Sequence, residues 1–139
     1  MASYVKYEQF VEDLANGVHN FGSNSFKFFL TNRAPVVGTD ATLADAVEIA
    51  AGNGYSAGGA AVTITSATQT GGTLSVVPAG DVVITASGGS IGPFRYVGFY
   101  NDTSASDSLV SSYDYGSSIS LNDGESFTID VGATLFTLA

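Results

Sequence analysis

The sequence contains no cysteine, so neither disulfide bonds nor thiolate-bound metals can stabilise its fold. It has a single histidine, His19, and no Gly-x-Ser-x-Gly motif, which would mark a nucleophilic serine. A catalytic histidine must face a nucleophile, whereas a lone histidine after a helix more often caps carbonyl groups or lies on the surface. We therefore expect that the protein is not an enzyme and has no catalytic or cofactor-binding residues.

Basic residues are also scarce, with 4 Lys and Arg against 13 Asp and Glu and a net charge of -9. All the basic residues lie before residue 96, so the remaining segment is purely acidic. Proteins bind nucleic acid and anionic membranes through Lys and Arg, so we expect neither as a partner. No apolar run reaches the roughly 18 residues of a membrane-spanning helix. The first ten residues also lack the basic stretch and apolar block of a secretory signal.

Charged residues make up only 12% of the chain, whereas 45% of the residues are hydrophobic. A disordered chain would show the opposite balance, and 139 residues suffice for one domain with its own core. The surface of a soluble monomer usually carries more charge than this. The composition therefore predicts a folded domain, part of whose surface is buried against a partner.

The first third of the chain predicts one short helix, one strand and a second helix. Phe10, Val11 and Leu14 form an apolar stripe with helical spacing, and Asn16-Gly17 is a typical helix end. The alternation in residues 25–31 predicts a strand with one buried face. Residues 39–51 predict a second helix, with Thr42 as its N-cap and Gly52 as its end, although an extended arm fits the segment equally well.

From residue 60 onward the pattern is β, with breaks at Gly- and Asn-rich turns. Asn122-Asp123-Gly124 is the clearest hairpin signal. Such spacing predicts a mainly β fold, an antiparallel sandwich or barrel-like sheet, with residues 1–24 as an N-terminal arm or short helix and residues 25–139 as the β-rich domain. The expected strands are 60–66, 73–78, 81–86, 94–100, 109–115, 117–121, 125–131 and 133–138.

Three further patterns resemble sites but have simpler interpretations. The Gly-rich segment 52–58 follows a predicted helix rather than a strand, so we interpret it as a connector and not as a phosphate loop. The acids of residues 102–130 lack the spacing of a calcium loop, so we expect solvated loop acids and no metal site. Aromatic residues around 94–100 and 113–115 are typical of cross-strand or core packing, or of sugar stacking. Arg95, inside this aromatic strand, is expected to pair with an acid within the subunit or across an interface.

Six segments spread over nearly the whole chain are distinctive in sequence. They are Phe-Val-Glu-Asp-Leu-Ala-Asn-Gly-Val-His-Asn (10–20), Phe-Leu-Thr-Asn-Arg-Ala-Pro (29–35), Ala-Ala-Gly-Asn-Gly-Tyr-Ser-Ala-Gly-Gly (50–59), Ser-Gly-Gly-Ser-Ile-Gly-Pro-Phe-Arg-Tyr (87–96), Tyr-Asn-Asp-Thr (100–103) and Asp-Tyr-Gly-Ser-Ser-Ile-Ser-Leu (114–121). Together these segments resemble a family of small structural proteins of tailed bacteriophages. The resemblance implies a virion protein, and within that class we favour a capsid decoration (cement) protein. It supplies no catalytic residues.

If the chain is a cement protein, we expect it to bind the major capsid protein on the capsid surface of the virion. We also expect it to associate with further copies of itself, most often as a trimer. The predicted helix is too short to be stable alone. We therefore expect Phe10, Val11 and Leu14, together with Arg95, to contact the capsid or a neighbouring subunit. The alternatives are a tail component (a tube, completion or baseplate protein) and a carbohydrate-binding module that uses Tyr96, Tyr100, Tyr113 or Tyr115.

Overall fold

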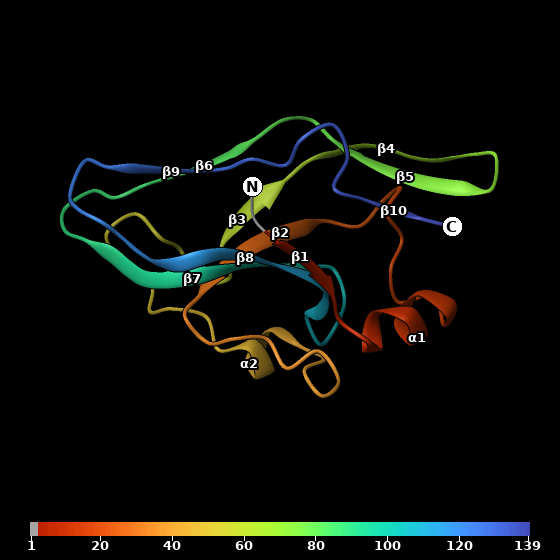
Figure 1. The fold of residues 1–139 in the computed structure, drawn as a ribbon, viewed down its shortest axis with the longest axis horizontal. Coiled ribbons are helices and arrows are strands. Elements are labelled where there is room, and N and C mark those ends of the chain that lie inside the picture. The colour runs from red at the N-terminus through yellow and green to blue at the C-terminus, as the bar shows by residue number, and fades with distance from the viewer. Residues whose placement is uncertain (1–2) are drawn as a thin grey trace.

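A computed structural model describes residues 3–139, and it is mainly β, with 47% strand and 8% helix. Figure 1 shows two layers of strands, with one short helix beneath the lower layer and the other beyond its right-hand end. The lower layer is an antiparallel five-stranded sheet with the order β1-β8-β7-β2-β3, here called the main sheet. Its strands are β1 (Ser3–Lys6), β8 (Ser108–Leu121), β7 (Ile91–Asn101), β2 (Phe26–Thr31) and β3 (Ala60–Val62).

The upper layer consists of two smaller antiparallel sheets (Figure 1). One has the order β10-β5-β4 and the other pairs β6 with β9. Their strands are β4 (Ile64–Thr70), β5 (Thr73–Pro78), β6 (Val82–Thr85), β9 (Ser126–Ile129) and β10 (Phe136–Leu138). The expected mainly β, antiparallel fold is therefore confirmed, and the main sheet is open, with β1 and β3 at its two edges.

The larger hydrophobic core lies between the two layers. Alternation along β2 directs Phe26, Phe28 and Leu30 into it, as the sequence predicts, and both upper sheets contribute side chains such as Val76 and Ile129. Phe26 stacks on Phe99 of β7 with ring centroids 5.3 Å apart. Burial of these large apolar side chains is the main stabilising term for a domain without disulfides.

A second, smaller core covers the opposite face of the main sheet. Phe29 of β2 points into this core and packs against Tyr100, with their ring centroids 5.8 Å apart. The covering segment includes helix α2 (Leu43–Ala46), which lies beneath the main sheet in Figure 1. Phe29 faces Gly98 of β7, where a Cβ atom would lie 2.1 Å from the Phe29 ring. β2 is therefore buried on both faces, and only glycine at position 98 leaves room for the ring.

The N-terminal segment is not a separate arm, contrary to the division expected at residue 24. β1 pairs with β8 as a strand of the main sheet. Helix α1 (Gln9–Ala15) then closes one end of the larger core, because the Phe10 ring packs edge-on against Phe21 and Phe136 at centroid distances of 6.1 and 5.8 Å. The helix ends at Asn16, followed by Gly17 with a φ of 77°, as its sequence predicts.

The second helix is much shorter than the expected 39–51. Thr42 is its N-cap, as predicted, with a reciprocal capping box to Asp45. The helix nevertheless ends after Ala46 and not at Gly52. The Thr31 hydroxyl of β2 donates to the carbonyl groups of Ala46 and Val47 at 3.1 and 2.7 Å. A longer helix would need these carbonyl groups as acceptors for its own backbone hydrogen bonds. No helix of residues 3–139 is long and apolar enough to cross a membrane.

The β-rich segment departs from expectation at three junctions. Residues 60–66 form two strands, because the chain leaves the main sheet at Thr63 and enters the upper layer. The expected strands 109–115 and 117–121 are one strand, β8, which continues through Gly116. Asn122-Asp123-Gly124 reverses the chain but forms no β8–β9 hairpin, since β8 pairs with β7 and β1 while β9 pairs with β6.

Candidate assembly surface

β1 is an edge strand of the main sheet, and its outward backbone groups have no partner among residues 3–139. The Tyr7 amide donates to the carbonyl of Val110, directly opposite it, at 3.1 Å. Hydrogen-bonded pairs occur at every second residue along antiparallel strands. Because Tyr7 belongs to such a pair, Val5 does too, and its amide and carbonyl groups point toward β8. Tyr4 and Lys6 must then direct their amide and carbonyl groups away from the main sheet. This open edge, formed by the backbone of Tyr4 and Lys6, can accept another strand.

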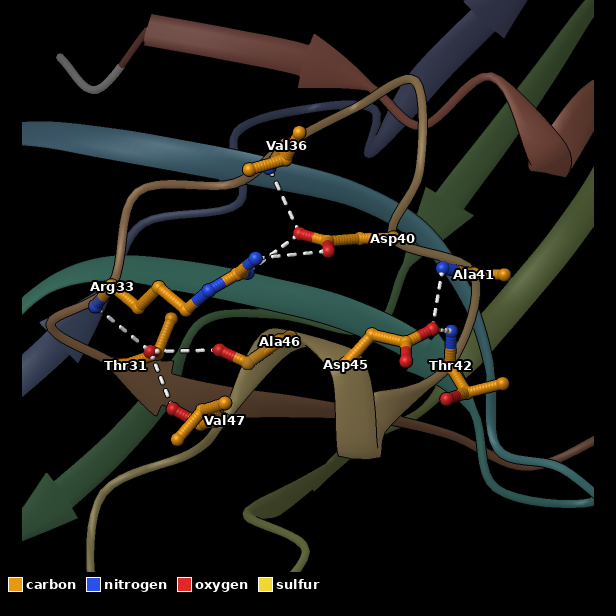
Figure 2. Close-up of polar contacts among 9 residues, drawn as sticks. All are labelled: Thr31, Arg33, Val36, Asp40, Ala41, Thr42, Asp45, Ala46 and Val47. Carbon is orange, nitrogen blue, oxygen red and sulfur yellow. Dashed lines mark hydrogen bonds and ion pairs between the residues drawn. The ribbon is translucent and has the colours of Figure 1, made fainter.

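The remainder of this edge is covered by the loop that precedes α2. The Glu8 amide donates to the Val37 carbonyl at 3.0 Å, and the Leu109 amide donates to the Ala41 carbonyl at 2.9 Å. Figure 2 shows how the loop is fixed: Arg33 donates two hydrogen bonds to Asp40, at 2.7 and 3.1 Å. Asp40 is only 3% exposed. This two-point ion pair, in which the carboxylate is buried and the guanidinium is partly exposed, holds the loop that covers the edge beyond β1.

A pocket of about 330 Å³ lies beside the open edge, between the two layers. Tyr4 stacks obliquely on Tyr113 of β8, with ring centroids 5.5 Å apart, and the Tyr113 hydroxyl donates to the Leu135 carbonyl at 3.1 Å. Burial raises the pKa of Tyr113, so the hydroxyl stays protonated at neutral pH and remains a donor. The complete lining is Tyr4, Tyr113, Asp130, Val131, Thr134, Leu135, Phe136 and Thr137.

Some of the charged groups near this edge lack ion-pair partners among the described residues of the subunit. Three of the four basic residues form ion pairs: Lys27, Arg33 and Arg95 with Asp102, Asp40 and Asp114 respectively. Lys6 is the fourth, and within residues 3–139 it forms no such pair. The same holds for Asp130 at the pocket in the described part of the chain. Lys6 on the edge strand and Asp130 in the pocket are therefore charges of opposite sign without ion-pair partners in the described part of the chain.

The predicted contact residues of α1 divide between the core and the surface. Phe10 is 1% exposed, so it stabilises the subunit and is not available to a partner. Leu14 is partly buried against the same core. Val11 is 51% exposed and remains a candidate contact. The spacing i, i+1, i+4 thus describes a helix that buries one side against its own sheet and leaves Val11 outside.

Arg95 pairs with an acid of its own subunit, which is one of the two arrangements expected for it. Its Nε and Nη2 atoms donate to Asp114 at 2.8 and 3.0 Å, and its guanidinium lies 5.3 Å from the Tyr96 ring centroid. The pair holds the pKa of the Asp114 carboxyl below its ordinary value. Asp114 lies opposite Ser3, so the ion pair flanks the first residue of β1.

His19 is buried among aromatic rings rather than on the surface or at a helix cap. Its ring lies 5.3 Å from that of Phe10 and 6.2 Å from that of Phe26. The Asn101 amide group contacts its Nδ1 at 3.2 Å, while Nε2 is buried without a hydrogen-bond partner among the described residues. Burial lowers the pKa of the imidazole, which favours its neutral form.

The other residues considered at the sequence level are divided among core, turns and connectors. Tyr100 is buried, and its hydroxyl donates to the Gly58 carbonyl at 2.6 Å, so it offers no surface for a sugar ring. Tyr96, Tyr113 and Tyr115 are half-buried. Glu48 accepts hydrogen bonds from Gly58 and the Tyr55 hydroxyl, which fixes the Gly-rich connector. Residues 3–139 contain no group of three or more His, Asp or Glu arranged to hold a metal.

Sequence reasoning did not single out Tyr4 and Lys6, and it considered Asp130 only as a solvated loop acid, although all three lie at the open edge and its pocket. β1 has only four residues and no turn signal before α1, so its pattern is too short to indicate a strand. The Ser-Tyr-Val-Lys composition is rich in strand-forming residues and is the only local signal. Asp130 comes beside Tyr4 only through the packing of the two layers.

Comparison of the chain with protein families, curated proteins and solved structures finds no match. Arguments about function therefore begin from the open edge, the pocket and the exposed side chains described above.

Proposed function

We propose that the protein is a capsid decoration protein of a tailed bacteriophage. It binds the outer capsid surface, contacts the major capsid protein at the junctions between capsomers, and acts as a homo-oligomer, a trimer on threefold or quasi-threefold axes. The resemblance of its segments to phage structural proteins supports the virion location. The acidic composition of residues 96–139 is consistent with a protein on the outside of a shell that holds nucleic acid inside.

The observation that carries the proposal is the open edge of the main sheet beside an apolar pocket. An unpaired edge with exposed Tyr4 and Val5 favours association, because a further strand would satisfy its backbone groups. Val11, on α1, adds another exposed apolar side chain, and the chain as a whole carries little charge. Together these features favour a subunit that works in an assembly.

A rigid subunit suits the mechanical role of a cement protein. A hydrophobic core packs against each face of the main sheet, and the Arg33–Asp40 ion pair holds the loop that precedes α2. A subunit that deforms little can bridge two capsomers and resist their separation. Because the subunit does not stretch, the capsomers can separate only if its contacts with them break. Closed cyclic symmetry would bury the same surface on each copy.

The proposal is tested by adding the purified protein to expanded capsids of its phage that lack it, and measuring occupancy by cryo-electron microscopy. We expect defined density on the outer surface at capsomer junctions. Val11→Asp should reduce occupancy, whereas Val83→Asp, at an equally exposed valine on β6, is the matched control. Absence of density on the outer surface at saturating protein would refute the function. Deletion of residues 1–24 is unsuitable, because it would remove Phe10 from the core.

The alternative functions predict different results in the same preparation. A tail tube or baseplate component should form hexameric rings, so a native mass of a hexamer together with bare capsids would favour the tail. A carbohydrate-binding module should bind glycans through exposed aromatic rings. Burial of Tyr100 removes one of its four candidate platforms, and binding on a glycan array would be the result that favours this function.

A further inference from the structure

We propose that the open edge joins two copies of the chain, with β1 of one copy antiparallel to β1 of the second about a two-fold axis at Val5. This contact goes beyond the proposed function and does not depend on it, since it can be measured in solution. The two copies would extend the main sheet across the dimer. The occupant of the edge is thus another molecule of this chain.

The backbone geometry of β1 is suited to this register. Tyr4 and Lys6 both direct their amide and carbonyl groups outward, as the alternation from Tyr7 establishes. With the axis at Val5, Tyr4 of one copy faces Lys6 of the other, and each such pair exchanges two hydrogen bonds. Val5 then faces its own counterpart as a non-hydrogen-bonded pair, in which side chains approach most closely.

Charge complementarity favours the same arrangement. Lys6 of the second copy would lie opposite Tyr4, whose side chain lines the pocket that contains Asp130. Its ammonium group can therefore reach either the Tyr4 ring or the Asp130 carboxylate. Lys6 has no ion-pair partner within residues 3–139 of its own subunit, and the same is true of Asp130, the one carboxylate that lines the pocket. A second copy supplies a partner to both, twice.

A lysine on a short edge strand has an opposite interpretation, in which it prevents pairing with other chains. The two interpretations predict opposite effects of the Lys6 charge on association, so a charge-reversal experiment distinguishes them. The two-fold contact would occupy the open edge, so the trimer and capsid contacts of the proposed function would then use other surfaces of the subunit, such as the one around Val11.

A single introduced cysteine tests the register, because the chain has no cysteine of its own. Val5→Cys places two sulfur atoms across the proposed axis, where the Cβ atoms of a non-hydrogen-bonded pair lie about 5 Å apart. Under mild oxidation it should form a disulfide-linked dimer. Val83→Cys, also on an exposed strand position, is the matched control and should remain largely monomeric. Equal cross-linking of the two variants would overturn the proposed register.

Charge reversal tests the role of Lys6. Sedimentation equilibrium should detect dimers of the wild-type chain, with either Lys6→Glu or Asp130→Lys raising the dissociation constant by about tenfold. The double variant Lys6→Glu, Asp130→Lys should restore association. Unchanged urea midpoints would show that the variants fold normally. The inference would be overturned if the wild-type chain formed no dimer at about 1 mM. It would also be overturned if Lys6→Glu associated more tightly than the wild type, or if the double variant did not recover association.

Discussion

Replacing Phe10 by alanine is expected to destabilise the subunit strongly, although the residue belongs to a helix that looks amphipathic and peripheral. Its ring is 1% exposed and packs against Phe21, Phe136 and His19, with centroid distances of 6.1, 5.8 and 5.3 Å. Removing a buried phenylalanine side chain costs about 3–5 kcal/mol, through lost transfer free energy and the cavity that remains. The several aromatic contacts place Phe10 toward the upper end of this range.

Val11 provides the matched comparison, because it is the next residue of the same helix and is 51% exposed. Val11→Ala should change the free energy of unfolding by about 0.5 kcal/mol or less, since alanine is also the better helix former. Urea denaturation followed by circular dichroism measures both variants. With a slope of about 2 kcal/mol per molar urea, Phe10→Ala should lower the midpoint by about 2 M.

The result that would refute the reasoning is equally specific. If Phe10→Ala and Val11→Ala shifted the urea midpoint by similar, small amounts, α1 would not close the core as described. If Val11→Ala were instead the more destabilising variant, the helix would be rotated so that its other side packs inward. A total stability of about 5–15 kcal/mol is typical of a domain, so the loss at Phe10 is a large fraction of the total and is readily measured by urea denaturation.

Three further predictions concern the buried imidazole, a close packing contact and an ion pair. Burial lowers the pKa of His19 in the folded chain, so as pH falls below about 6.5 the unfolded chain binds the proton first and stability decreases; the urea midpoint should fall between pH 7.5 and 5, and less so in His19→Phe. Gly98→Ala should cost about 1–3 kcal/mol in urea denaturation, because its Cβ would overlap the Phe29 ring; an unchanged midpoint would contradict this contact. Arg95→Gln should raise the pKa of the Asp114 carboxyl toward its ordinary value in an NMR titration; an unchanged pKa would show that the pair does not form in solution.

The sequence predicts those parts of the fold that depend on local pattern. Alternation over residues 25–31 identifies the buried face of β2, Thr42 identifies a helix start, and Asn16-Gly17 identifies a helix end. These succeed because side-chain period and backbone conformation are set within a few neighbouring residues. The mainly β class follows in the same way from the regular turn signals after residue 60.

Features that depend on the arrangement of elements were not predictable. The turn at 122–124 indicates that the chain reverses, but it does not indicate which sheet the next strand joins. The stripe at Phe10, Val11 and Leu14 does not reveal whether the helix packs on its own sheet or on a partner. The unpaired state of Lys6 emerges only when the other three basic residues are located beside their acids.

The contact between Phe10 and Phe136 has a consequence for how the chain folds as it is synthesised. Its two rings belong to the first helix and the last strand, yet both lie in the same core. The core therefore cannot close around α1 until residue 136 has left the ribosome. Contacts so distant in sequence slow folding, because a long loop must be ordered before they form. Until then the nascent chain lacks the contact that covers the Phe10 ring, in a period when aggregation competes with folding.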